Sequence, residues 1–137
     1  MLSRLQSLGG GMLVIRTAQM EAFRSLTEKL FAQRLCILLR QYQADDCIAL
    51  GDEELHAFVE QQLLRARHRG FTWETSLGDF VSLSLSVGVN FDQHQFIAPL
   101  LDDTSIDIDH RLMVVQRTLE VRDWDEVRNS CSNRAPA

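Results

Sequence analysis

The clearest pattern in the chain is an amphipathic segment over residues 17–43. Apolar residues recur there at three- and four-residue steps, which is the spacing of one helix face, and neither glycine nor proline interrupts them. Thr17 precedes the stripe, and its hydroxyl suits the N-terminal cap of a helix. The pattern therefore predicts a long helix that begins at Thr17. Its predicted buried stripe is Met20, Phe23, Leu26 or Thr27, Leu30, Phe31, Leu35, Leu38, Leu39 and Tyr42.

A second helix is predicted after a turn at residues 44–46 and a short apolar piece at 47–50. Asp52 is expected to cap it, because an aspartate side chain accepts hydrogen bonds from the free amides of the first turn. Gly70 is expected to end it in the left-handed conformation. The stripe predicted to be buried is Leu55, Phe58, Val59, Leu63 and Ala66.

Residues 81–87 carry two competing patterns. The run VSLSLSV alternates apolar and small polar residues, as in a strand, but no other segment alternates and a lone strand would have no partner. A helix over 73–87, with Thr72 as its cap, places apolar side chains on one face. Small Ser84 and Gly88 would then allow another helix to approach closely. The helix is the favoured interpretation.

Three shorter helical segments are predicted further on. The first spans Gln93 to Leu101, with Pro99 tolerated near one end. The second covers residues 107–119, with Leu112, Val115 and Leu119 facing inward. The third is a last turn or two over residues 124–129, capped by Asp123.

These elements together predict an all-α protein, built as a single compact bundle of five or six helices, mostly antiparallel because the loops are short. Three glycines at 9–11 indicate a break before the domain. Residues 1–11 are therefore expected to be a flexible tail, or an extension upstream of Met12 as the true start. The helical domain is predicted over 12–130 and a C-terminal tail over 131–137.

Composition narrows the function classes. The chain has 137 residues, 45% of them hydrophobic, and a net charge of −5, which is the wrong sign for a general nucleic-acid binder. We find no signal peptide and no apolar run long enough to span a membrane, so a cytoplasmic location is expected. The wide spacing of Cys36, Cys47 and Cys131 indicates reduced thiols, with Cys36 in the core.

The acidic residues ahead of the predicted 107–119 helix are the best candidate for a metal site. Carboxylate oxygens suit calcium or magnesium, but the glycine and glutamate of a calcium loop are missing. A solvated loop that leads into a helix cap explains the same residues, so no metal is expected. The cluster consists of Asp102, Asp103, Asp107, Asp109 and His110.

Two other polar features have structural explanations. His56 and Glu60 lie one helical turn apart, which favours a surface ion pair over a metal site. The basic run at residues 65–69 could meet a phosphate or an acidic partner, but cations at a helix C-terminus also complement the helix dipole. Trp73 and Trp124 are predicted to be packing residues.

No catalytic chemistry is evident. Serines 82, 84 and 86 lie outside any nucleophile motif, and no glycine-rich loop precedes a helix in the manner of a phosphate-binding site. We therefore predict no catalytic residue, no cofactor and no enzymatic activity. A small metal-dependent enzyme built on the 102–110 cluster is the weakest of the hypotheses.

Several motifs follow one another in a recognisable order: MLVIRTAQMEAF at 12–23, the stretch 31–39, RARHRGF at 65–71, TWETSL at 72–77, FVSL at 80–83 and VGVNFD at 87–92. In this order the chain resembles a group of small helical proteins encoded beside type VI secretion effectors and PAAR spike-tip proteins of Gram-negative bacteria. Members usually have bulkier residues where this chain has Leu83-Ser84-Leu85. The resemblance itself favours a helix there and a domain that begins near Met12.

The resemblance implies a cytosolic accessory role, in which the protein binds an effector, or the adaptor that loads it onto the spike, before export. No residue can be carried over as a binding site, because the shared motifs are structural. The rival hypothesis is a cytosolic immunity protein that neutralises a cognate toxin, since an acidic surface would suit the basic groove of a nuclease. The sequence leaves the partner and the oligomeric state open.

Overall fold

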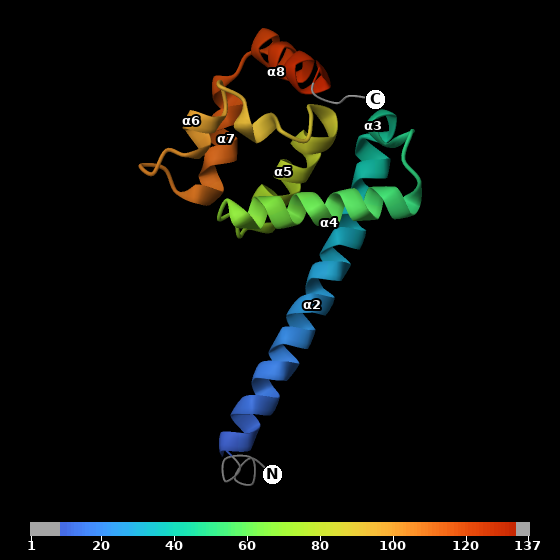
Figure 1. Cartoon of the computed structure of the whole chain (residues 1–137), viewed down its shortest axis with the longest axis vertical. Coiled ribbons are helices and arrows are strands. Elements are labelled where there is room, and N and C mark those ends of the chain that lie inside the picture. The colour runs from blue at the N-terminus through green and yellow to red at the C-terminus, as the bar shows by residue number, and fades with distance from the viewer. Residues whose placement is uncertain (1–8, 134–137) are drawn as a thin grey trace. The chain divides into compact units, whose positions relative to one another are not determined.

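The computed structural model describes residues 9–133, with the side chains of residues 19–131, and this part of the chain contains helices and no strand. The prediction of an all-α protein is confirmed, and so is the helix over the serine-rich segment. The elements are α2 (Gly9–Tyr42), α3 (Ala44–Cys47), α4 (Asp52–His68), α5 (Glu74–Ser86), the 3-10 helix η1 (Phe91–Gln93), α6 (Ala98–Leu101), α7 (Ile108–Thr118) and α8 (Val121–Asn133) (Figure 1).

Helix α2 begins at Gly9, so Thr17 lies inside the helix and the prediction that it caps the N-terminus is wrong. The glycines at 9–11, which the sequence placed in a flexible tail, are helical. Glycine lowers helix stability by about 1 kcal/mol per residue, but unlike proline it keeps its amide hydrogen and fits the helix. Residues 1–8 of that predicted tail lie outside the described residues.

The chain divides into two compact units, one up to Arg34 and one from Leu35 onward. In the first unit every described side chain from residue 19 to 30 is exposed, so burial of the first half of the predicted stripe is wrong. The three- and four-residue spacing identifies side chains that share a helix face, but burial also needs another element against that face. In the second unit Leu35 and Leu39 are buried as predicted, whereas Leu38 and Tyr42 are exposed.

The core of the second unit forms where α4 packs against α5 and α5 packs against α7 (Figure 1). Phe80 is fully buried at its centre, and its ring lies 6.0 Å from that of Phe71 and 5.1 Å from that of Phe91. Helix α6 packs against α7, and α8 packs against η1. The aliphatic residues of this core are Leu55, Val59, Leu63, Ala66, Leu77, Val81, Leu112, Val115 and Val127.

The ends of α4 follow the expected chemistry with one correction. Gly51, not Asp52, occupies the N-cap position, and its amide donates a hydrogen bond to Glu54 Oε1 at 3.2 Å. Asp52 is the first helical residue and pairs with Arg40 at 3.1 Å. At the other end Gly70 has a φ of +105°, which confirms the left-handed terminator.

The serines of α5 are accommodated by hydrogen bonds. Buried Ser84 donates to the carbonyl oxygen of Phe80 at 2.9 Å, one turn earlier in the helix, and the Ser82 hydroxyl bonds to the Gln43 side chain. Among the buried side chains that the structure describes, none leaves a nitrogen or oxygen atom without a hydrogen bond. The serines that alternate with apolar residues over 81–87 are therefore compatible with a packed helix.

The C-terminal helices differ from their predicted bounds. Helix α6 covers only Ala98–Leu101, with Pro99 in its first turn, and Gln93 belongs to η1. The α7 prediction is confirmed, including its buried side chains. Helix α8 begins three residues earlier than expected, because the Asp123 carboxylate accepts the Glu120 amide at 2.9 Å from within the first turn, so the prediction that Asp123 precedes the helix as its cap is wrong. The helix also includes residues 131–133 of the predicted tail.

Cys47, rather than Cys36, is the buried thiol, whereas Cys36 is half-buried. Burial raises the pKa of both thiols above the ordinary value, although the positive charge of Arg40 acts in the opposite direction. Both are therefore protonated at neutral pH, which makes them poor nucleophiles.

Gly88 allows the close approach that the sequence predicted, although its neighbour is α8. Its φ is +150°, and a Cβ atom added there would lie 2.2 Å from the Cβ of Cys131. We expect Gly88→Ala to lower the free energy of unfolding by about 1–3 kcal/mol, because the added methyl strains the backbone and pushes α8 away.

Gly78→Ala is the matched control for this prediction. A Cβ at Gly78 would meet only the end of the Leu35 side chain, at 3.4 Å, so the gain in helix propensity should leave the protein equally stable or more stable. Urea denaturation followed by circular dichroism measures both variants. Equal loss of stability in the two would show that the contact with Cys131 is not the cause.

Candidate functional site

The acidic cluster does not form one site, because its members have different partners. Asp109 is buried at the start of α7 and caps the neighbouring helix α5: it accepts hydrogen bonds from the Thr72 amide at 2.8 Å, the Thr72 hydroxyl at 2.7 Å and the Trp73 amide at 3.0 Å. Ser76 donates to the Asp109 main-chain carbonyl at 2.9 Å. The prediction that Thr72 caps α5 is therefore wrong, because the cap comes from Asp109 of α7.

The other acidic residues are also engaged locally. Asp102 pairs with Arg69 at 3.2 Å, and Asp107 lies 3.5 Å from the ring of His110. Hydrogen bonds from the hydroxyl and the amide of Ser105 hold the pKa of Asp103 below its ordinary value. Within the described residues no three histidine, cysteine, aspartate or glutamate side chains come together in an arrangement that could hold a metal ion.

Trp73 packs less than predicted. It is 48% exposed, and its ring meets the ring of His110 edge-on with centroids 4.9 Å apart. Trp124 is half-buried on α8. The ion pair predicted between His56 and Glu60 is present, with Nδ1 and Oε1 3.1 Å apart.

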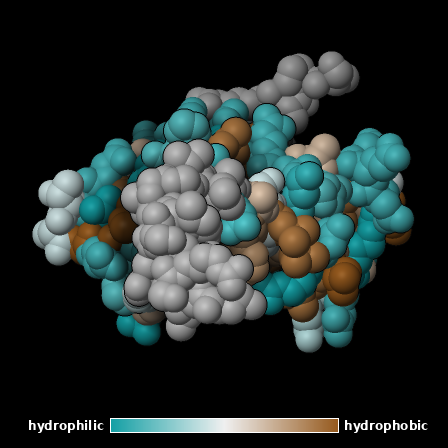
Figure 2. All heavy atoms as spheres, turned by 90° about the horizontal axis from the view of Figure 1, so that it is seen from below, coloured by the Kyte–Doolittle hydropathy of each residue, from teal (hydrophilic) through white to brown (hydrophobic). Residues whose placement is uncertain are grey.

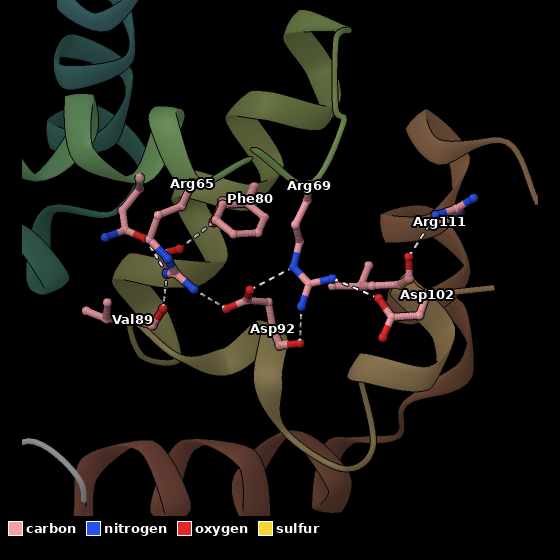
Figure 3. A network of polar contacts seen from close by, with 10 residues as sticks. Arg65, Arg69, Phe80, Val89, Asp92, Asp102 and Arg111 are labelled. Carbon is pink, nitrogen blue, oxygen red and sulfur yellow. Dashed lines mark hydrogen bonds and ion pairs between the residues drawn. The ribbon is translucent and has the colours of Figure 1, made fainter. Parts of the chain in front are cut away.

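The basic run at the end of α4 turns partly inward. Arg65 and Arg69 both bind Asp92, whose side chain is only 4% exposed, at 2.6 and 2.8 Å (Figure 3). Arg69 also donates to the Asp92 main-chain carbonyl at 3.0 Å. Arg65 and Arg69, which the sequence suggested as possible contacts for a phosphate or an acidic partner, therefore hold η1 against α4.

Further contacts extend this network across the second unit. The Arg65 guanidinium also binds the side chain of Gln62 at 2.8 Å and the carbonyl oxygen of Val89, and it lies 5.7 Å from the ring centroid of Phe80. Arg111 donates to the carbonyl oxygen of Leu101 at 2.9 Å, next to Asp102 (Figure 3). One network of charged side chains thus joins α4, η1, α6 and α7.

Among the residues that the structure describes, two surfaces have features that suit a ligand or a partner and have no role within the fold. The first is an open pocket of about 320 Å³ between the η1 region and α8, lined by Asn90, Gln93, His94, Gln95, Glu126, Ser130 and Cys131. No sequence signal predicted it, because its two walls lie some thirty residues apart and contain no motif. The second is a set of four exposed apolar side chains on α2 in the first unit: Met20, Phe23, Leu26 and Leu30, which we call the α2 row.

Comparisons with known proteins add no functional information. No protein-family model, curated protein or solved structure matches the chain. Within the described residues, no helix combines the length and the apolar character that crossing a bilayer requires. The two surfaces described above are therefore the features of this structure that bear on its function.

Asp109 provides a pH-dependent test of the fold. Burial acts to raise its pKa, but the hydrogen bonds from Trp73 and Thr72 outweigh burial and lower the pKa below the ordinary 3.8. A lowered pKa stabilises the folded state above pH 3.8, and this stabilisation is lost as the pH falls through the folded-state value. We expect Asp109→Asn to cost about 1–2 kcal/mol at pH 7, and less at pH 3, because protonation of the carboxyl group in the unfolded state removes part of the stabilisation there.

Urea midpoints at pH 7 and pH 3 measure this difference. The control is Asp107→Asn on the same turn, because Asp107 is exposed and does not cap α5. A gap between wild type and Asp109→Asn that stays constant with pH would contradict a stabilising role for the ionised carboxylate.

The ion pairs of Asp92 should be worth far more than the surface pair of Glu60. We expect Asp92→Asn to lower the free energy of unfolding by about 2–4 kcal/mol, because two arginines lose the charge that compensates for their burial. Glu60→Gln, which breaks only an exposed pair, should cost about 0.5 kcal/mol or less. Thermal and urea unfolding of the two variants, side by side, give the comparison, and similar losses would show that the network adds little to stability.

Proposed function

We propose that this protein is a non-catalytic accessory protein that binds the apolar face of a partner helix through the α2 row. The observation that carries the proposal is the exposure of four large apolar side chains along one helix: 56% for Met20, 71% for Phe23, 55% for Leu26 and 50% for Leu30. Single exposed apolar residues are normal, but a contiguous set of them is typical of an interaction surface. Hydrophobic side chains are visible at the surface among hydrophilic ones in Figure 2.

The geometry of α2 gathers these residues on one side. At 100° per residue, Met20, Leu26 and Leu30 all lie within about 60° of Phe23 around the helix axis. Glu21 and Glu28 lie on the opposite side, so no carboxylate interrupts the row. An uncharged stripe with this spacing suits a partner helix that offers apolar side chains at the same three- and four-residue steps.

The resemblance to proteins encoded beside type VI secretion effectors supports one setting for this binding. In the proposal the partner is a secretion effector, or the adaptor that loads it, and the accessory protein covers an apolar segment of that partner in the cytoplasm before export. The second candidate is a cytoplasmic immunity protein for a cognate toxin, which the net charge of −5 favours if the toxin has a basic active-site groove.

The test uses variants of the row with a matched control. Phe23→Glu and Leu30→Glu each place a charge in the α2 row. We expect each substitution to weaken the binding of the purified protein to its purified effector partner at least tenfold. Ser25→Glu adds the same charge on the opposite side of α2, where the exposed serine should tolerate it. Isothermal titration calorimetry measures the affinity, and effector stability and export in a deletion strain measure the biological effect.

Three outcomes would contradict the proposal. Equal affinity of Phe23→Glu and wild type would exclude the α2 row as the binding surface. A change from dimer to monomer in Phe23→Glu, seen by analytical ultracentrifugation, would show that the row joins two copies of this chain. Rescue of growth from the toxin, with no effect on its stability or export, would favour the immunity protein instead.

A further inference from the structure

We infer that the polar pocket between the η1 region and α8 is a binding site for a guanidinium group, such as the side chain of an exposed arginine on a partner protein. The pocket lies wholly within the second unit, so the inference does not rest on the α2 row. Its volume of about 320 Å³ is at the lower end of the range for ligand sites and is suited to one side chain or a small molecule.

The chemistry of the lining favours a polar ligand over an apolar one. All seven lining residues carry a polar atom or a thiol, and neither an aliphatic nor a phenyl side chain is among them. Most small-molecule sites are lined mainly by hydrophobic and aromatic groups, which this pocket lacks. Its ligand must therefore be held by hydrogen bonds and charge.

Most of the side chains around the pocket, though not His94 and Cys131, keep their hydrogen-bonding capacity. Within the described part of the chain, five of them have neither a hydrogen bond nor an ion pair: Asn90, Gln93, Gln95, Glu126 and Ser130. The buried carboxylate of Asp92, by contrast, is held by ion pairs with Arg65 and Arg69. The pocket is thus a place where acceptors gather without an internal structural role.

The charge of the pocket favours a cation. Among the described residues that line the pocket, Glu126 is the only acidic one, and none is an arginine or a lysine. The nearby Arg128 is held by Asp125 at 3.1 Å and by the Ser86 carbonyl oxygen at 3.4 Å. A phosphate or carboxylate would therefore meet the charge of Glu126 with no cation in the lining to balance it.

A guanidinium group matches this lining better than an ammonium group. It carries five N–H donors in a planar array, and the pocket offers three side-chain amide oxygens, one hydroxyl and one carboxylate as acceptors. An ammonium group has only three donors and is more strongly hydrated.

Two of the lining residues, His94 and Cys131, are held in place by contacts within the fold. His94 Nδ1 accepts the Phe96 amide at 3.0 Å, and the two rings are in contact with centroids 4.8 Å apart. On the other side, the tight contact between Gly88 and Cys131 fixes α8 against the end of α5. The acceptor side chains themselves must be ordered on binding, which costs conformational entropy and is consistent with a weak interaction with one side chain.

The experiment titrates the full chain with N-acetyl-L-arginine amide and follows the amide signals by two-dimensional NMR. We expect saturable shifts at Asn90, Gln93 and Gln95, with a dissociation constant in the millimolar range. N-acetyl-L-citrulline amide has the same shape without the charge and should bind at least tenfold more weakly. Glu126→Gln should weaken the arginine ligand at least tenfold, whereas Glu53→Gln, an exposed glutamate outside the pocket, should bind as wild type does.

Two results would overturn the inference. Absence of saturable shifts in the pocket with the arginine ligand would exclude a guanidinium site. Equal affinity for the citrulline ligand, or equal affinity of Glu126→Gln and wild type, would show that the charge does not select the ligand. Glu126 is exposed, so the substitution should leave the fold intact, and the circular dichroism spectrum of the variant checks this.

Discussion

The buried carboxylate of Asp92 organises the second unit of this protein. It lies in the 3-10 helix η1, where its side chain is almost fully removed from water, and a lone charge there would strongly destabilise the fold. Arg65 and Arg69, four residues apart at the end of α4, neutralise this charge. Arg69 also forms an ion pair with Asp102, directly after α6. Because Asn90 and Gln93, close to Asp92 in the sequence, line the polar pocket, the position of that wall depends on the pairing of Asp92 with the two arginines.

Most of the charged residues near this network have structural roles. The sequence suggested two candidate binding sites, the cations at the end of α4 and the aspartates before α7. In the structure the two groups are joined by the ion pair between Arg69 and Asp102. Asp109 of α7 supplies the N-terminal cap of α5, in place of a residue next to that helix in the sequence. Because the two residues that precede α5 are held by a side chain distant in sequence, the position of its first turn depends on tertiary packing.

The two surfaces left without a structural role differ in character. The α2 row is apolar and extends along a helix, which suits a partner with a helical apolar stripe. The pocket is polar, small and acidic, which suits one cationic group.

The sequence by itself determined the helical class, the position of α4, α5 and α7, the inward residues of α7 and the terminator at Gly70, because helical periodicity and glycine conformation are local properties. It did not determine which of the apolar residues of α2 are buried, since periodicity defines a face but not what lies against it. Nor did it reveal the role of Asp92, the cap from Asp109 or the pocket. Each of these joins residues that are more than twenty positions apart, and only the packing of α4, α5, α7 and α8 brings them together.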